Sequence, residues 1–224
     1  MQHLLYLHGF VSSPASTKAT FLADRLAAYH LSLSCPDLNL PDFSTLTVTR
    51  MIRQVEGELA GREPGPSVVF GSSLGAFVAL HLAERLDSMW PTVDRMVWLA
   101  PALDFVGSIR RDYGDERLTR WKETGWIETP HYGHGDIRRV HYGLYSDAQQ
   151  YDSFVTRNTV PTLIVQGRRD SVVDPATVQR FADHRPHVKL VMLDDDHQLK
   201  GSLDTVWSET CAFLGLKGGD SAGC

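Results

Sequence analysis

The sequence has few cysteines and no long apolar run, and each shortage excludes a class of protein. The three cysteines, Cys35, Cys211 and Cys224, stand at wide and unpatterned spacing, which excludes a disulfide framework or a cysteine metal site and favours free thiols in a reducing compartment. No apolar stretch approaches the ~20 residues of a membrane helix. The first residues enter an apolar run without a preceding basic segment, so no secretory signal is visible. These shortages predict a cytoplasmic protein with no membrane partner.

A strong charge of either sign is also missing. The formal net charge is −5, and the basic residues form no stripe, so nucleic acid is not an expected partner. The only dense basic spots are the pairs Arg110-Arg111 and Arg138-Arg139. We interpret both as solvated loop faces, with the alternative that positive corners near a site favour an anionic substrate.

Short apolar runs alternate with helical patterns along most of the chain. The expected strands are 3–7, 31–36, 67–70, 96–99, 162–165 and 188–193, and apolar residues at helical spacing mark 16–29, 48–59, 74–86, 176–182 and 203–214. Strands that alternate with helices form parallel sheets covered on both faces. The pattern therefore predicts an α/β fold with a mostly parallel sheet of about six strands.

The alternation breaks once, between residues 103 and 158. This stretch contains two Trp, five Tyr and three His, with helical patches at 116–123 and 147–155. It is too long for an ordinary connection and too aromatic for a disordered linker, so we expect an inserted lid. The alternative is a structural excursion without ligand contact. We predict a single domain over 1–217 and a flexible tail over 218–224.

One short motif carries the chemistry. Gly71-Ser72-Ser73-Leu74-Gly75 fits G-x-S-x-G between an expected strand and an expected helix. In that context the serine sits on a tight turn, with its hydroxyl exposed at the carboxyl edge of the sheet. Glycine is required on either side because larger side chains would collide with backbone in such a turn. The motif predicts Ser73 as a nucleophile.

A serine nucleophile needs a base and an acid, which follow it in the chain order Ser, Asp or Glu, His. Asp170 follows the fifth expected strand and His197 follows the sixth, so both loops leave the same sheet edge as Ser73. Asp104, after the fourth strand, and Asp174, close to Asp170, remain alternative acids. Asp196 would have to fold back sharply to reach its neighbour.

The oxyanion of an acyl transfer needs preorganised N–H donors. We expect the backbone N–H groups of Leu74 and of Phe10, since His8-Gly9-Phe10 follows the first strand and starts like an esterase oxyanion motif. His8 and Gly9 would then border the substrate pocket. A role for His8 in packing alone stays open.

Leu7-His8-Gly9-Phe10, Gly71 to Gly75, Gly167-Arg168-Arg169-Asp170 and Asp196-His197 together resemble the α/β-hydrolase superfamily, in particular its compact bacterial esterases. The resemblance implies an acyl-enzyme mechanism with neither a metal nor an organic cofactor. It departs in one respect, because the oxyanion loop follows the very first strand and the superfamily's usual first two strands are absent. A six-stranded sheet in spatial order 2-1-3-4-5-6 would result.

The expected function is hydrolysis of a small-molecule carboxylic ester by Ser73, Asp170 and His197. A thioesterase, a lactonase or a peptidase would use the same three residues and remains an alternative. A non-catalytic binding protein of the same fold is the alternative outside the enzymes. The aromatic insertion suggests an apolar acyl or aryl pocket with Trp121 and Trp126 as walls. A metal site at His131, His134 and His141 is disfavoured because their spacing fits no ligand pattern.

Overall fold

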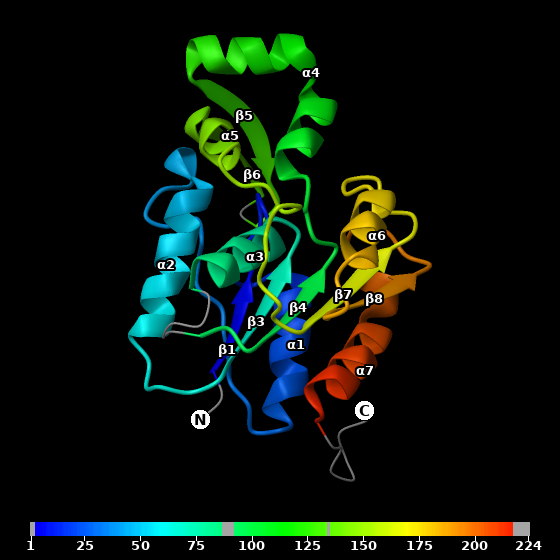
Figure 1. Cartoon of the computed structure of the whole chain (residues 1–224). Helices are drawn as coiled ribbons and strands as arrows, with labels where there is room; N and C mark the ends of the chain where they lie inside the picture. Colours follow the sequence, from blue (N-terminus) through cyan, green and yellow to red (C-terminus); the bar gives the residue numbers. More distant parts are fainter. Residues whose placement is uncertain (1–2, 87–91, 134, 217–224) are drawn as a thin grey trace.

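The computed structural model describes residues 3–86, 92–133 and 135–216, and Figure 1 shows the chain. The predicted tail, 218–224, lies outside them. Along the chain the helices and strands are β1 (His3–Leu7), α1 (Thr17–Ala27), β2 (Leu33–Ser34), the 3-10 turn η1 (Phe43–Thr45), α2 (Val48–Ala60), β3 (Ser67–Ser72), α3 (Leu74–Leu86), β4 (Arg95–Leu99), α4 (Phe105–Thr124), β5 (Trp126–His131), β6 (Asp136–His141), α5 (Gly143–Ala148), β7 (Thr162–Gly167), α6 (Pro175–Asp183), β8 (Val188–Leu193), η2 (Lys200–Ser202) and α7 (Leu203–Leu214).

The predicted α/β fold is confirmed. Six strands form one sheet in the order β2-β1-β3-β4-β7-β8, and every neighbouring pair is parallel. The labels β7 and β8 belong to the strands expected at 162–165 and 188–193. They are numbered so because two further strands, β5 and β6, form a separate antiparallel hairpin that the sequence analysis did not predict.

Two apolar layers cover the sheet because its strands are apolar on both faces. In β1 the side chains of Leu5 and Leu7 join the core that contains α2, α3 and α6, whereas Leu4 and Tyr6 join the core beneath α1 and α7. This alternation follows from the two-residue period of a strand. The sheet is thereby a rigid base for the loops at its carboxyl edge.

The insertion forms a separate cap beyond the carboxyl edge of the sheet (Figure 1). It consists of α4, the β5–β6 hairpin and α5, and α4 bends at Gly114, where φ is 69° and ψ is 165°. The helix expected at 147–155 is absent, because α5 ends at Ala148. Within α5 the Asp147 carboxylate accepts hydrogen bonds from the backbone N–H (2.8 Å) and the hydroxyl (2.6 Å) of Thr49 on α2.

The tip of the hairpin reaches back to the loop that follows β1. The backbone N–H of Gly133 donates to the carbonyl of Val11 at 3.2 Å, and the ring of His131 meets that of Phe43 edge-on at 4.7 Å. Phe43 in turn stacks on Phe10 at 5.7 Å. The cap therefore contacts the loop that the sequence analysis assigned to the oxyanion.

Two further sequence expectations concern thiols and membranes. Cys35 is a free thiol, but Cys211 is disulfide-bonded, so the expectation of free thiols throughout is wrong at Cys211. Within the described residues, no helix combines the length and the apolar character needed to cross a bilayer.

Candidate active site

Ser73 stands alone between β3 and α3 with a positive φ of 52°. Its two glycine neighbours make this turn possible. A Cβ on Gly75 would overlap the backbone carbonyl of Leu7, and one on Gly71 would lie 2.5 Å from the Cα of Ala76. The steric argument made from the motif therefore has a visible cause at each position.

The strained turn is held in place by hydrogen bonds to the neighbouring strand. The backbone N–H of Ser73 donates to the carbonyl of Leu99 at 3.0 Å, and the N–H of Ala102 donates to the carbonyl of Ser73 at 3.2 Å. A residue with φ above zero persists only where its surroundings over-determine it. The end of β4 supplies that constraint, so the side chain of Ser73 has a defined direction.

Asp170 and His197 lie within hydrogen-bonding distance of each other. His197 Nδ1 is 2.8 Å from Asp170 Oδ2. The same Oδ2 accepts from Gln166 Nε2 at 2.9 Å, while Oδ1 accepts from the backbone N–H groups of Val172 and Val173, each at 2.8 Å. Each oxygen of this buried carboxylate therefore has two hydrogen-bonding partners. Because these partners fix the carboxylate, the imidazole has one preferred orientation.

The charge state of Asp170 follows from these contacts. Burial by itself raises the pKa of a carboxyl group, but the hydrogen bond and charge of His197, with the donors Val173 and Gln166, hold the pKa of Asp170 below its usual value. The ionised carboxylate can accept a hydrogen bond from Nδ1 of His197, and this contact leaves Nε2 of the ring outside it.

The three alternative acids are engaged elsewhere. Asp104 is the N-cap of α4 and accepts the backbone N–H of the third helix residue at 3.1 Å. Asp174 caps α6 in the same way at 3.0 Å, and Asp196 accepts the N–H two residues further on at 2.8 Å. Each carboxylate satisfies local backbone donors, and of the four candidates only Asp170 has a hydrogen bond to His197 among the described residues.

Ser73 and His197 share the carboxyl edge of the sheet, at the ends of β3 and β8. Within the described part of the chain no hydrogen bond joins Ser73 Oγ to the imidazole. Hydrogen bonds of this kind are often long in a free enzyme and tighten when the substrate binds.

The loop after β1 lies against Ser73. A Cβ on Gly9 would be 3.3 Å from the Cβ of Ser73 and 4.0 Å from its Oγ, so only glycine allows so close an approach of backbone. Leu74 is the first residue of α3, and the N–H groups of a first helical turn have no partner within the helix. The structure thus places Gly9 against Ser73 and Leu74 directly after it, and the assignment of Phe10 and Leu74 to the oxyanion stays a prediction.

The buried ring of His8 holds this loop through hydrogen bonds to the backbone. It is 2% exposed, its Nδ1 donates to the carbonyl of Gly9 at 2.9 Å, and its Nε2 accepts from the N–H of Leu38 at 3.0 Å. Burial lowers the pKa of His8. Because Nε2 is occupied as an acceptor, the 3.3 Å approach of Asp37 is to a neutral ring. Both ring nitrogens of His8 therefore contact the backbone of this part of the chain, which favours the packing role over the expected place in the substrate pocket.

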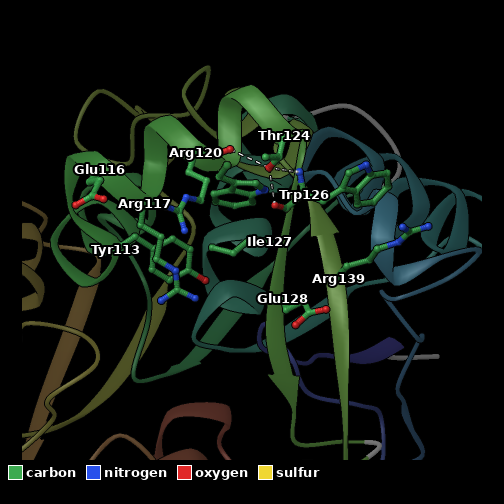
Figure 2. A pocket seen from close by; sticks show the side chains of 10 residues that line it. Tyr113, Glu116, Arg117, Arg120, Thr124, Trp126, Ile127, Glu128 and Arg139 are labelled. Atoms are coloured by element: carbon green, nitrogen blue, oxygen red, sulfur yellow. Dashed lines mark hydrogen bonds between the residues drawn. The ribbon is translucent and has the colours of Figure 1, made fainter.

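Trp121 and Trp126, expected as pocket walls, line a cavity of about 800 Å³ in the cap (Figure 2). Trp121 is 1% exposed and its Nε1 donates to the carbonyl of Val140 at 3.0 Å. On the rim the guanidinium group of Arg139 lies 4.5 Å over the ring of Trp126. Neither Ser73, Asp170 nor His197 lines this cavity, so the structure does not bring the expected wall residues together with the expected triad.

Two residues near His197 were missed by the sequence analysis. Gln166 is a fully buried amide inside an otherwise apolar strand, and a polar residue in such a run is the signal that was available. Lys18 lies four residues before Leu22 on the buried stripe of α1, and its Nζ donates to the carbonyl of His197 at 3.2 Å. A lysine on an apolar stripe was the corresponding signal.

The histidines weighed as metal ligands gather no ligand set. Across the described ranges no group of three or more His, Cys, Asp or Glu side chains is placed to hold a metal ion. His131 and His141 stand at opposite ends of the paired strands β5 and β6, and His134 lies outside the described residues.

A family sequence model, described as uncharacterised protein family UPF0227, matches residues 3–214. The chain belongs to this family. This UPF0227 member also resembles solved structures, among them a proposed hydrolase from Agrobacterium vitis S4, with 23% identity, a TM-score of 0.83, and coverage of 95% of this chain and 88% of that one.

Two further solved structures resemble the UPF0227 member. Mouse alpha/beta hydrolase domain-containing protein 10 matches with 19% identity, a TM-score of 0.78, and coverage of 96% of this chain and 90% of that one. Est1E of Butyrivibrio proteoclasticus, with ferulic acid bound, matches with 17% identity, a TM-score of 0.75, and coverage of 96% and 89% respectively. These likenesses establish the α/β-hydrolase fold.

Proposed function

We propose that this protein is a serine hydrolase that cleaves carboxylic esters through an acyl-enzyme, with Ser73, His197 and Asp170 as its catalytic residues. The observation that carries the proposal is the His197–Asp170 contact of 2.8 Å, with Asp170 held ionised, at the same sheet edge as a serine with φ of 52°. A packing role explains neither the strained backbone of the serine nor a buried carboxylate with two hydrogen-bonding partners on each oxygen.

Ser73 Oγ attacks the ester carbonyl while His197 Nε2 takes the hydroxyl proton. Asp170 remains a carboxylate and stabilises the imidazolium that forms. The N–H groups of Phe10 and Leu74 stabilise the oxyanion, and the imidazolium then returns its proton to the leaving alcohol. Water, activated by the same nitrogen of His197, releases the acid from Ser73. Every step uses groups of this chain alone.

The substrate class is proposed from the cap. Trp121 and Trp126 give its cavity apolar walls, and Arg117 and Arg139 place guanidinium groups over the rings of Tyr113 and Trp126 at 4.3 and 4.5 Å. Such a surface suits a planar or aromatic part of the substrate, and because no residue of the triad lines the cavity, that part would lie away from the ester bond that is cleaved. The ferulic acid bound by Est1E, an esterase fold relative, agrees with this choice.

The decisive test is the substitution Ser73→Ala in a screen of p-nitrophenyl esters of graded acyl length, with an aryl ester and a thioester included. The variant is expected to lose turnover of every ester, while its circular dichroism and unfolding temperature stay those of the wild type. Retained turnover would assign the reaction to another group. Faster turnover of the thioester than of the matched ester would change the substrate class and leave the mechanism.

A cytoplasmic location belongs to the same proposal, as does a small-molecule partner in place of nucleic acid or membrane. The disulfide at Cys211 is the observation that opposes a reducing compartment. Fractionation of the source cells, with thiol labelling of the purified protein, tests the location directly.

A further inference from the structure

Lys18 is a cation in a place that disfavours one. It is the second residue of α1 and only 7% exposed, on the stripe that also buries Leu22 and Leu26. Burial removes water from the ammonium group, and the positive end of the helix dipole adds repulsion in the first turn. A methionine of similar length would fill this position without either cost, so the charge calls for a specific explanation.

The surroundings of the ammonium group supply that explanation. Its Nζ donates a hydrogen bond of 3.2 Å to the main-chain carbonyl of His197. Three carboxylates, those of Asp170, Asp195 and Asp196, act on it with favourable charge, and Lys200 acts on it with unfavourable charge. The ammonium group of Lys18 therefore contacts the backbone of His197. It also interacts electrostatically with Asp170, the carboxylate that orients the imidazole.

His197 thus has two anchors of different kinds. The Asp170 carboxylate contacts the ring through Nδ1 at 2.8 Å, and Lys18 on α1 donates a hydrogen bond to the main-chain carbonyl of the same residue. Hydrogen bonds at Asp195 and Asp196 hold the neighbouring backbone, but none of them involves the carbonyl group of His197, which is the group that Lys18 contacts. A shift of about 1 Å in a catalytic group can cost about 100-fold in rate.

We infer that Lys18 is a positioning residue, whose charged ammonium group fixes the backbone of His197 so that Nε2 points at Ser73. The inference rests on the proposed function for its effect on rate. Its structural part, the coupling between Lys18 and His197, does not depend on the reaction catalysed.

The coupling has a pH signature. Burial lowers the pKa of Lys18 to about 8, although Asp170, Asp196 and Asp195 favour its charged form. The charged form is the anchor, so kcat/KM of the wild-type protein should fall as the pH rises through about 8. That parameter reports the ionisation of the free enzyme.

The first experiment compares Lys18→Met, Lys18→Arg and the control Lys200→Met. Lys18→Met should lower kcat by about 10- to 100-fold with little change in KM, because positioning and not binding is lost. Lys18→Arg should restore most of kcat and remove the alkaline decline, since guanidinium stays charged. Lys200→Met removes an exposed positive charge from the same neighbourhood and should leave kcat unchanged.

The second experiment follows the ring Cε1–H resonance of His197 by NMR between pH 6 and 10, and it needs no substrate. The wild-type resonance should show an inflection near pH 8 that is absent in Lys18→Arg. This measurement decides the matter even if Lys18→Met fails to fold. If the wild-type protein hydrolyses no ester, the proposed function fails while the inflection still reports on the anchor.

Three results would overturn the inference: wild-type kcat in a folded Lys18→Met variant, equal losses in Lys18→Met and Lys200→Met, or an inflection near pH 8 that persists in Lys18→Arg. The first shows that the contact has no effect on rate. The second assigns the effect to net charge, and the third assigns the titration to another group.

Discussion

The sheet and the cap bury their interiors with different kinds of side chain. The strands of the sheet are nearly continuous runs of aliphatic residues, and all six residues of β3 and of β7 are buried. The cap instead packs Trp121 against Tyr113, Tyr142 and Tyr145 and buries polar residues of its hairpin, Thr129 and His131. The sheet thus holds the proposed catalytic residues at the ends of buried strands, whereas the interior of the cap is aromatic and partly polar.

The largest expected effect is on kcat, and it distinguishes Asp170 at the sheet edge from Asp104 at the start of the cap. Asp170→Asn should lower kcat by about 10⁴-fold, because an amide forces the wrong tautomer on the imidazole. Asp104→Asn should leave kcat nearly unchanged, since asparagine caps a helix about as well as aspartate. Steady-state kinetics of both variants on one p-nitrophenyl ester measure this. A larger loss in Asp104→Asn would move the acid to the cap.

The next effect contrasts glycines of the two regions. Gly75→Ala places a methyl group against the carbonyl of Leu7, and because neither the new methyl group nor the carbonyl can rotate away, we expect a loss of about 3 kcal/mol in unfolding free energy. Gly114→Ala meets no atom within 4 Å, but has φ of 69°, so strain of about 1–2 kcal/mol is expected. Urea unfolding measures both. Equal losses would mean that the cap is as tightly specified as the sheet.

The smallest expected effect is a pH dependence of stability at His81, where α3 of the sheet layer contacts the segment that follows the cap. His81 on α3 packs between Phe77 (4.5 Å) and Tyr151 (5.0 Å), the latter from the segment after α5. Burial lowers the pKa of His81 to about 4, against the raising effect of Glu84 and Asp152. Between pH 6.5 and 4 the unfolded chain binds the proton that the folded chain refuses, so stability is full above this window and falls with decreasing pH.

For His81 this linkage amounts to about 2 kcal/mol between pH 7 and pH 5. Urea unfolding at the two pH values should show the loss in the wild type and a smaller loss in His81→Gln, which cannot titrate. An identical pH dependence in the two proteins would assign the acid sensitivity to other groups and contradict the lowered pKa of His81.

The difference between the regions also governs what the sequence could predict. The strand expected at 67–70 is β3, Ser67–Ser72, and the helix expected at 74–86 is α3, because burial on both faces leaves an apolar run that local pattern detects. The β5–β6 hairpin has few apolar residues, and β5 contains Pro130, a residue that argues against a strand in a local pattern. Its pairing depends on contacts with η1 and the loop after β1, which no local pattern reports.

The candidate site divides in the same way. Ser73, Asp170 and His197 were predicted from a motif and from chain order, since parallel topology brings strand ends to one edge. Lys18 and Gln166 were not predicted, because their importance arises only from contact with His197 and Asp170. The assignment of Trp121 and Trp126 to the substrate pocket remains a prediction, as they line the cap cavity and not the sheet edge.

The central claim is that the fold activates Ser73 in particular, and labelling with a fluorophosphonate tests it most directly, because only an activated serine reacts readily. Intact-mass and peptide mass spectrometry of the labelled protein should show one adduct per chain, on the peptide that contains Ser73, and none in Ser73→Ala. An unlabelled wild-type protein, or an adduct that persists in Ser73→Ala, would contradict the account.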